Sequence, residues 1–179
     1  MSVVNVGLIG AGTVGCGVIK VLDQNNEIIK KRTGITLNLK KIADVDPDRK
    51  RPVRIPRGKI TRDAGELIND PSIDIIIELI GGTTIAKDLV LAALRNKKHV
   101  VTANKALLAH HGKEIFAAAA ENGVEVGFEA SVGGGIPIIK STLESFAANN
   151  ILSIHGIING TSNYILSRMT DEGSEFGDV

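Results

Sequence analysis

The chain has 179 residues, of which 43% are hydrophobic and 23% charged, and its formal net charge is +1. This length allows one complete domain and the start of another. The near-neutral charge gives no indication of a nucleic-acid or membrane-surface partner. The single cysteine excludes an internal disulfide framework. There is no signal-peptide pattern, and no apolar run approaches the about 20 residues that span a bilayer. We therefore expect a soluble, cytoplasmic protein.

Strand-like and helix-like segments alternate along the chain. The expected strands are 3–9, 35–43, 73–80, 99–102, 124–128 and 151–158. The expected helices are 13–31, 64–68, 85–95, 113–121, 138–148 and one that begins near 162, and a loop is expected over 47–58. This alternation favours an α/β fold with a doubly wound parallel sheet of the Rossmann type. We expect a dinucleotide-binding domain over 1–150 and, over 151–179, the incomplete start of a substrate-binding domain.

A glycine-rich sequence, Gly10-Ala11-Gly12-Thr13-Val14-Gly15, stands between the first expected strand and the first expected helix. In this context the G-x-G-x-x-G pattern predicts a dinucleotide phosphate loop. Gly10 permits the tight turn, Gly12 lets the backbone approach a pyrophosphate, and Gly15 lets the helix pack closely. The N–H groups at the helix start, at Thr13 and Val14, would face the phosphates. A glycine-rich turn without a ligand is the alternative.

An acidic residue at the end of the second strand usually accepts hydrogen bonds from a ribose of the dinucleotide. Asp44 and Asp46 both stand there, and Asp44 is preferred because it directly follows the strand. A turn-forming role for Asp44, before Asp46-Pro47, remains equally open.

Four further segments follow in a characteristic order. They are Gly81-Gly82, the run 99–109 (HVVTANKALLA), the run 128–137 (FEASVGGGIP) and the run 156–166 (GIINGTSNYIL). In this order and at these distances they closely resemble the homoserine dehydrogenases, and the resemblance covers essentially the whole chain.

The resemblance implies interconversion of L-homoserine and L-aspartate 4-semialdehyde by hydride transfer with NAD or NADP, on the route to threonine and methionine. Proteins of that family continue well beyond Val179, through a mixed sheet used for substrate binding and dimer formation. That part supplies acidic substrate contacts and a second lysine regarded as the acid/base. We therefore expect this chain to bind the dinucleotide but not to turn over by itself, and the full-length protein to be a homo-oligomer.

By resemblance, Lys105 lies beside the nicotinamide and takes part in catalysis. It follows a strand end, where open α/β sheets bind ligands, and alcohol oxidation needs a group that takes the hydroxyl proton. Without the resemblance, a surface lysine would be the simpler interpretation. Gly81 and Gly82 are expected to pass over the cofactor.

The resemblance also implies a monovalent cation, usually sodium. Its ligands would be Glu129 and the carbonyl oxygens of Val132, Gly134 and Ile136, since a carboxylate and carbonyl oxygens suit a hard cation. The alternative is a glycine hinge between domains, with Glu129 as a cap at a helix start.

Gly160 and Thr161 are expected to touch the amino-acid substrate. Thr161 could also be a helix N-cap, a common role for threonine.

Three other functions remain as alternatives. A semialdehyde dehydrogenase that forms a thioester needs an activated cysteine, and Cys16, in the first helix, is expected to be core filler instead. A sugar-type oxidoreductase also ends a strand in a lysine motif, but the segments 102–105 and 159–164 argue against it. A non-catalytic NAD-binding module has no supporting feature beyond the short length.

Cofactor preference depends on the residues after the second strand. Family members that use NADP tend to carry an arginine or lysine where Val45 stands. Asp44 would repel a 2′-phosphate, whereas Arg49 and Arg51 could pair with one. We predict that both cofactors bind, NAD at least as tightly as NADP.

Overall fold

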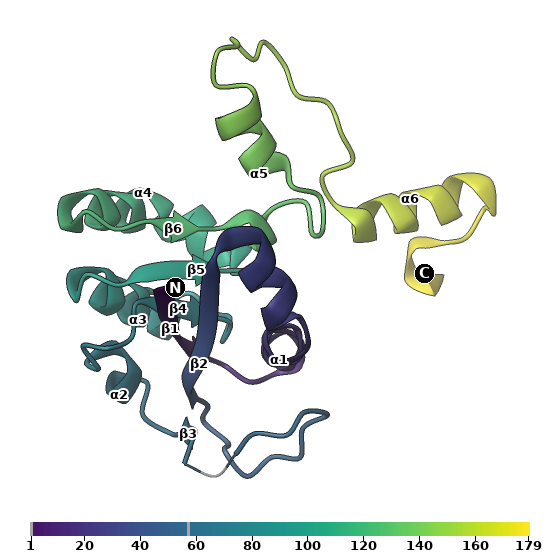
Figure 1. The fold of residues 1–179 in the computed structure, drawn as a ribbon. Coiled ribbons are helices and arrows are strands. Elements are labelled where there is room, and N and C mark those ends of the chain that lie inside the picture. Colours follow the sequence, from purple (N-terminus) through teal and green to yellow (C-terminus); the bar gives the residue numbers. More distant parts are fainter. Residues whose placement is uncertain (1, 57) are drawn as a thin grey trace. The chain divides into compact units, whose positions relative to one another are not determined.

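The computed structural model describes residues 2–56 and 58–179, and these divide between 139 and 140 into two compact units. The first unit is built on a six-stranded, wholly parallel sheet with the order β3-β2-β1-β4-β5-β6 (Figure 1). The strands are β1 (Ser2–Ile9), β2 (Ile35–Ala43), β3 (Ile60–Thr61), β4 (Ile75–Glu78), β5 (His99–Thr102) and β6 (Val126–Gly127). This order confirms the predicted doubly wound α/β sheet, whose strand sequence reverses between β1 and β4.

Helices cover both faces of this sheet. They are α1 (Thr13–Thr33), α2 (Gly65–Ile68), α3 (Thr84–Arg95) and α4 (Lys105–Asn122). One core lies between the sheet and α2, α3 and α4, and the other lies between the sheet, α1 and the loop that carries Val53 and Ile55. Because the central strands are covered on both faces, their sequences are the continuous apolar runs typical of parallel sheets. Within the described residues, no helix has the length and apolarity that crossing a bilayer requires.

Two helices differ from the sequence-based expectation. α4 begins at Lys105 rather than at 113, because the Asn104 side chain caps it by accepting the Leu107 N–H at 3.1 Å. Gly112 does not interrupt α4; it is buried within the helix. The expected helix 138–148 is instead a short α5 (Ile138–Lys140) that passes into a π-helical turn, η2 (Ser141–Ser145).

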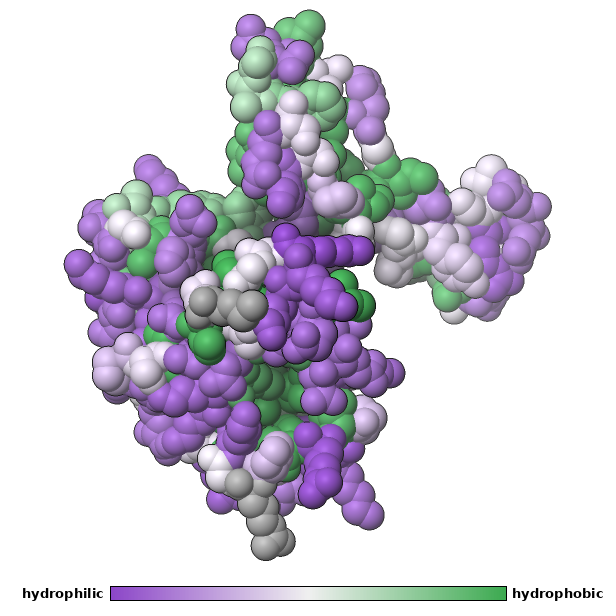
Figure 2. All heavy atoms as spheres, viewed as in Figure 1, coloured by the Kyte–Doolittle hydropathy of each residue, from purple (hydrophilic) through white to green (hydrophobic). Residues whose placement is uncertain are grey.

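The strand expected over 151–158 is absent, and this prediction was wrong. The segment is irregular, and its apolar side chains are exposed, with Leu152 at 95% and Ile158 at 99%. Hydrophobic residues are visible on the surface of the second unit in Figure 2. A strand forms by pairing with a neighbour, and the described residues of the second unit hold no other strand. α6 (Gly160–Asp171) and the 3₁₀ turn η3 (Phe176–Asp178) complete this unit. The domain boundary expected between 150 and 151 lies after the division between the two units and stays a prediction.

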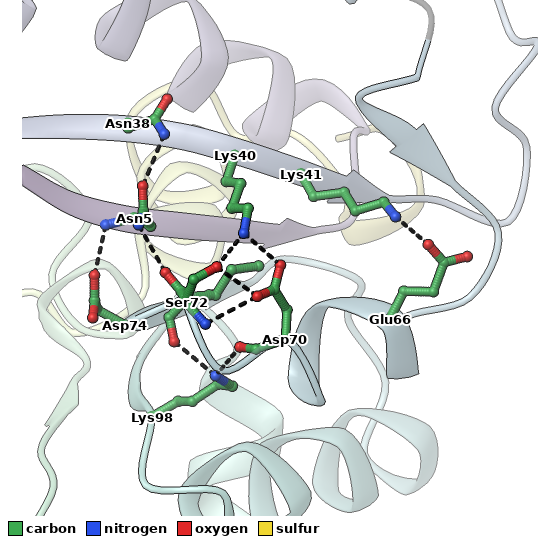
Figure 3. A network of polar contacts seen from close by, with 10 residues as sticks. Asn5, Asn38, Lys40, Lys41, Glu66, Asp70, Ser72, Asp74 and Lys98 are labelled. Carbon is green, nitrogen blue, oxygen red and sulfur yellow. Dashed lines mark hydrogen bonds and ion pairs between the residues drawn. The ribbon is translucent and has the colours of Figure 1, made fainter.

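A polar network joins the strands near their amino ends (Figure 3). The Lys98 side chain is buried, and its Nζ donates to the carbonyl oxygens of Asp70 and Ile73 at 2.6 and 2.7 Å. Burial lowers the pKa of Lys98, although the charges of Asp70 and Asp74 oppose this effect. Lys40 adds an ion pair to Asp70 at 2.7 Å. The network therefore ties β2 to the loops before β4 and β5, at the end of the sheet opposite the glycine loop.

Candidate active site at the carboxyl edge of the sheet

Four residues in register mark the carboxyl ends of adjacent strands. Ala43 of β2 pairs with Ile9 of β1, Ile9 with Glu78 of β4, and Glu78 with Thr102 of β5. The loops that follow these four residues carry Asp44, the glycine sequence, the Gly81-Gly82 pair and Lys105, respectively. The structure thus brings every predicted cofactor-binding residue to one edge, at the point where the strand order reverses. Open α/β sheets bind their ligands there.

Each of the three glycines of the loop is explained by a different structural requirement. Gly10 has a φ of +98°, and a Cβ there would lie 2.8 Å from the backbone of Leu79. A Cβ on Gly15 would lie 2.1 Å from the Gly10 carbonyl oxygen, so α1 could not pack against its own loop. A Cβ on Gly12 would meet no atom within 4 Å. Because the fold itself leaves room for a side chain at Gly12, its glycine fits close approach by a ligand.

The amino end of α1 offers donors at this loop. Gly12 is the N-cap, and no side chain caps the helix. The intrahelical bonds begin with Cys16 N–H to the Gly12 carbonyl oxygen at 2.9 Å, so the N–H groups of Thr13 and Val14 precede them. Both residues are exposed. Cys16 is buried, and its thiol donates to the Ala11 carbonyl oxygen at 3.4 Å, in agreement with its expected role in packing.

Asp44 directly follows β2 and contacts the glycine loop. Its Oδ2 accepts the Ala11 N–H at 2.7 Å, and its Oδ1 accepts the Asp46 N–H at 2.9 Å. Burial alone would raise the pKa of Asp44. The two N–H groups, together with the charge and hydrogen bond of Arg51, outweigh this effect and lower it. The carboxylate therefore both holds the local turn and stands beside the phosphate loop, so the two interpretations of Asp44 are compatible.

The sequence suggested Arg51 only as a possible partner of a 2′-phosphate, but in the structure its side chain is enclosed by protein groups. Its side chain is 5% exposed and pairs with Asp44 through Nη2 and Oδ1 at 3.0 Å. The guanidinium also donates to the carbonyl oxygens of Ala11, Asp46, Pro47 and Arg49, at 2.6 to 3.1 Å. Arg51 thus fastens the loop after β2 onto the glycine loop.

Glu78 is a site residue that the sequence analysis missed. It ends β4, is fully buried, and accepts hydrogen bonds from the Ile80 N–H at 2.9 Å and the Gly81 N–H at 3.3 Å. Gly81 and Gly82 follow with φ values of +74° and +72°, which explains the glycine pair. A lone carboxylate that ends an apolar strand was the sequence signal.

Lys105 is the first residue of α4 and is exposed at the same edge. Its neighbour Asn104 reaches across to the glycine pair, donating from Nδ2 to the Gly82 carbonyl oxygen at 2.6 Å. The turn after β4 and the turn after β5 are therefore joined directly beside Lys105.

The segment proposed to hold a cation follows β6. Glu129 begins the 3₁₀ turn η1 (Glu129–Ser131), and its Oε1 accepts the Ile139 N–H at 2.9 Å. The Ile136 carbonyl oxygen accepts the Ile138 N–H at 2.8 Å, and the φ values of Gly133 and Gly134 are +69° and +61°. Among the described residues, no three His, Cys, Asp or Glu side chains cluster as a metal site would require. A cation here would depend on carbonyl oxygens.

Gly160 and Thr161 lie in the second unit, as the first two residues of α6. The N-cap is Asn159, whose Oδ1 accepts the Ser162 N–H at 2.8 Å. The interpretation of Thr161 as the cap was therefore wrong, because the helix begins one residue before it.

A cavity of about 690 Å³ in the first unit lies elsewhere, between the middle of α1, β2, residues 52–56 and Lys59. None of the predicted site residues lines it. Two of its polar lining side chains, Asn26 and Lys59, already bond to the backbone of Leu37 and Leu39. We therefore place the candidate site at the carboxyl edge, on geometry rather than on cavity size.

The sequence and the fold match known proteins. A family model described as "Homoserine dehydrogenase, NAD binding domain" matches residues 10–129, and one described as "Homoserine dehydrogenase" matches 137–179. A homoserine dehydrogenase of Neisseria gonorrhoeae is 50% identical over all of this chain, which spans 41% of that protein.

Solved structures agree with these matches. A homoserine dehydrogenase from Thiobacillus denitrificans is 49% identical with a TM-score of 0.92, over 99% of this chain and 41% of that one. A hyperthermophilic archaeal homoserine dehydrogenase in complex with NADPH is 25% identical with a TM-score of 0.80, over 98% of this chain and 59% of that one. With its site geometry and these matches, the chain belongs to the homoserine dehydrogenase family.

Proposed function

We propose that the protein of which this chain forms part interconverts L-homoserine and L-aspartate 4-semialdehyde with NAD or NADP, and that this chain supplies the dinucleotide site. The observation that carries the proposal is the open space over Gly12, beside uncapped N–H groups and between two glycines that the fold itself requires. A pyrophosphate group fits such a cradle because its charge is stabilised by those N–H groups and by the helix dipole.

The order of the strands at the carboxyl edge of the sheet would fix the direction in which the dinucleotide lies. Asp44 lies on the β2 side of the glycine loop. Its carboxylate has lone pairs that its protein contacts do not use, and these would accept a hydrogen bond from a ribose hydroxyl. Gly81 and Gly82, after β4, and Lys105, after β5, would hold the nicotinamide end. When bound, the dinucleotide supplies the hydride acceptor for alcohol oxidation.

Lys105 would act on the substrate side. Its exposed Nζ stands where the hydroxyl of an alcohol could hydrogen-bond, and it would orient that hydroxyl and share its proton. Gly160 and Thr161 would contact the amino-acid part of the substrate. The second lysine and the acidic contacts that the family implies would come from the part of the relatives that this chain does not match.

Glu129 and the carbonyl oxygens of Val132, Gly134 and Ile136 would hold a monovalent cation, sodium or potassium. Support comes from the acidic side chain next to a glycine turn with two left-handed residues. Thermal melts in sodium and in a bulky organic cation, at matched ionic strength, should differ for the parent and coincide for Glu129→Gln. Coincident melts for the parent would contradict the site.

Turnover tests the proposal. The complete protein should form NAD(P)H in a homoserine-dependent way, and Lys105→Met should lower kcat by about 100-fold or more. This chain alone should bind dinucleotide without measurable turnover, because holding alcohol, base and nicotinamide in one geometry supplies about 7–11 kcal/mol. Ordinary dehydrogenase turnover by this chain, about 1–10³ per second, would show that the chemistry is misplaced.

A further inference from the structure

The Glu78 carboxylate is buried at a place where sheet packing alone would accept an apolar side chain. Burial of a carboxylate is costly unless hydrogen bonds compensate for the lost water. Glu78 is 0% exposed, and the hydrogen bonds that its carboxylate accepts come from the turn after β4 and from the end of β5. Oε1 accepts the Ile80 and Gly81 N–H groups, and Oε2 accepts the Thr102 hydroxyl at 2.7 Å.

The same hydrogen bonds continue into the turn after β5 and return. The Thr102 Oγ1 accepts the Asn104 N–H at 3.0 Å, and the Asn104 Nδ2 donates to the Gly82 carbonyl oxygen at 2.6 Å. Since Gly82 follows the N–H groups that Glu78 holds, the contacts close into a ring. We call this set, Glu78, Thr102, Asn104 and the 80–82 turn, the Glu78 ring.

The Glu78 ring lies on the nicotinamide side of the proposed site. Asp44, directly after β2, would mark the adenosine-ribose side, and the glycine loop after β1 would mark the phosphates. β4 and β5 therefore carry the other half of an extended dinucleotide. Lys105 directly follows Asn104, and the buried Ser131 hydroxyl donates to the Thr102 carbonyl oxygen at 2.9 Å, which connects a third turn.

We propose that Glu78 is a positioning residue: through the ring it holds the Gly81-Gly82 turn and the start of α4 in the single arrangement in which nicotinamide and Lys105 meet. This inference rests on the proposed function and deepens it. Catalytic groups must be held within a fraction of an ångström, and buried hydrogen bonds behind them provide this.

Glu78→Gln is the sharpest variant because it keeps the size of the side chain. The carboxylate accepts from donors on both oxygens, whereas an amide offers one oxygen and one NH₂ group. With its oxygen toward Ile80 and Gly81, the NH₂ group can donate to the Thr102 oxygen, but the Thr102 hydroxyl proton then loses its acceptor. Flipped, the NH₂ group faces the two N–H donors. Either orientation leaves at least one buried donor of the ring without the acceptor that Glu78 provides. Thr102→Val removes the hydroxyl at similar volume, and Thr102→Ser keeps it.

Amide hydrogen exchange of this chain tests the coupling without any ligand. Glu78→Gln and Thr102→Val should each speed exchange in both turns, 80–82 and 104–107, by about tenfold. Thr102→Ser should exchange like the parent. Faster exchange in only one turn, or in neither, would overturn the inference that the ring couples them.

Binding of NADH and of ADP-ribose, which lacks the nicotinamide, tests the role. Glu78→Gln should weaken NADH binding by about tenfold while ADP-ribose binding stays within about twofold. A merely structural role would weaken both probes alike and would contradict the inference, as would unchanged binding of both. If the parent binds neither probe, the proposed function itself fails, and with it the nicotinamide role of Glu78.

Discussion

The Arg51 guanidinium and the Asp44 carboxylate form an ion pair at 3.0 Å in which the side chains are only 5% and 13% exposed. Arg51 therefore neutralises the acidic residue that would meet the adenosine ribose, and its donors are directed at protein oxygens. An arginine in this position is not aimed at a 2′-phosphate. We therefore expect a free ribose hydroxyl to be preferred at Asp44, so that NAD binds at least as tightly as NADP.

The first prediction concerns cofactor preference. The parent chain should bind NAD at least as tightly as NADP, and Asp44→Asn should weaken NAD by about tenfold because a charged acceptor for the ribose hydroxyl is lost. NADP should lose less, since its phosphate no longer meets a carboxylate. Calorimetric titration of both cofactors into both proteins checks this. A tenfold preference of the parent for NADP would contradict it.

Arg51 should also matter for stability. Arg51→Met leaves the Asp44 charge without its ion-pair partner and removes one donor from each of four carbonyl oxygens, so the free energy of unfolding should fall by about 2–4 kcal/mol. The exposed neighbour Lys50 provides the control, and Lys50→Met should change stability by less than about 0.5 kcal/mol. Urea unfolding of the three proteins gives the comparison. Equal stabilities would mean that the loop after β2 does not depend on the pair.

The glycines of the phosphate loop should separate folding from binding. Gly12→Ala meets open space, so its melting should stay close to the parent, while dinucleotide binding falls by about tenfold or more because the pyrophosphate loses its approach. Gly15→Ala drives a methyl group into the Gly10 carbonyl oxygen and should destabilise the chain by about 1–3 kcal/mol. Thermal melts and NADH titration distinguish the two. Unchanged NADH binding by Gly12→Ala would place the phosphates elsewhere.

Acid should destabilise the chain through two carboxylates, Asp70 in the network at the amino ends of the strands and Glu66 in α2. Hydrogen bonds from Lys40 and then Ser72 hold the pKa of Asp70 well below its usual 3.8, and Lys41 and then Thr61 lower that of Glu66 from 4.5. Because both pKa values are depressed in the folded state, their stabilisation is complete above about pH 4.5 and is lost as the pH falls further.

Asp70→Asn makes this dependence testable. Thermal melts between pH 7 and pH 2.5 should show the parent losing more stability than the variant below pH 4. High salt should reduce the difference, since both carboxylates are near solvent. Parallel curves for the two proteins would show that Asp70 does not contribute.

Whether a feature could be predicted from the sequence depends on whether a local sequence pattern or a contact between distant segments determines it. The positions of strands β1, β2, β4, β5 and β6, together with the glycine loop and Asp44, could be predicted from the sequence because local patterns specify them, whereas the two-residue strand β3 was missed. Glu78 and Arg51 could not, since their importance arises from contacts between loops that are distant along the chain. The strand expected over 151–158 failed for a related reason: the segment is rich in apolar, β-branched residues, but the described residues of the second unit offer no neighbouring strand to pair with. Local pattern also misplaced the cap of α6, since Asn159 and Thr161 are both good capping residues.

Fluorescence titration of NADH into this chain tests the central claim, that the loops at the carboxyl edge of the sheet form a complete dinucleotide site. We expect a saturable signal that ADP-ribose displaces and that Gly12→Ala weakens. No saturable signal up to about 1 mM NADH, the upper end of ordinary KM values, would contradict the account.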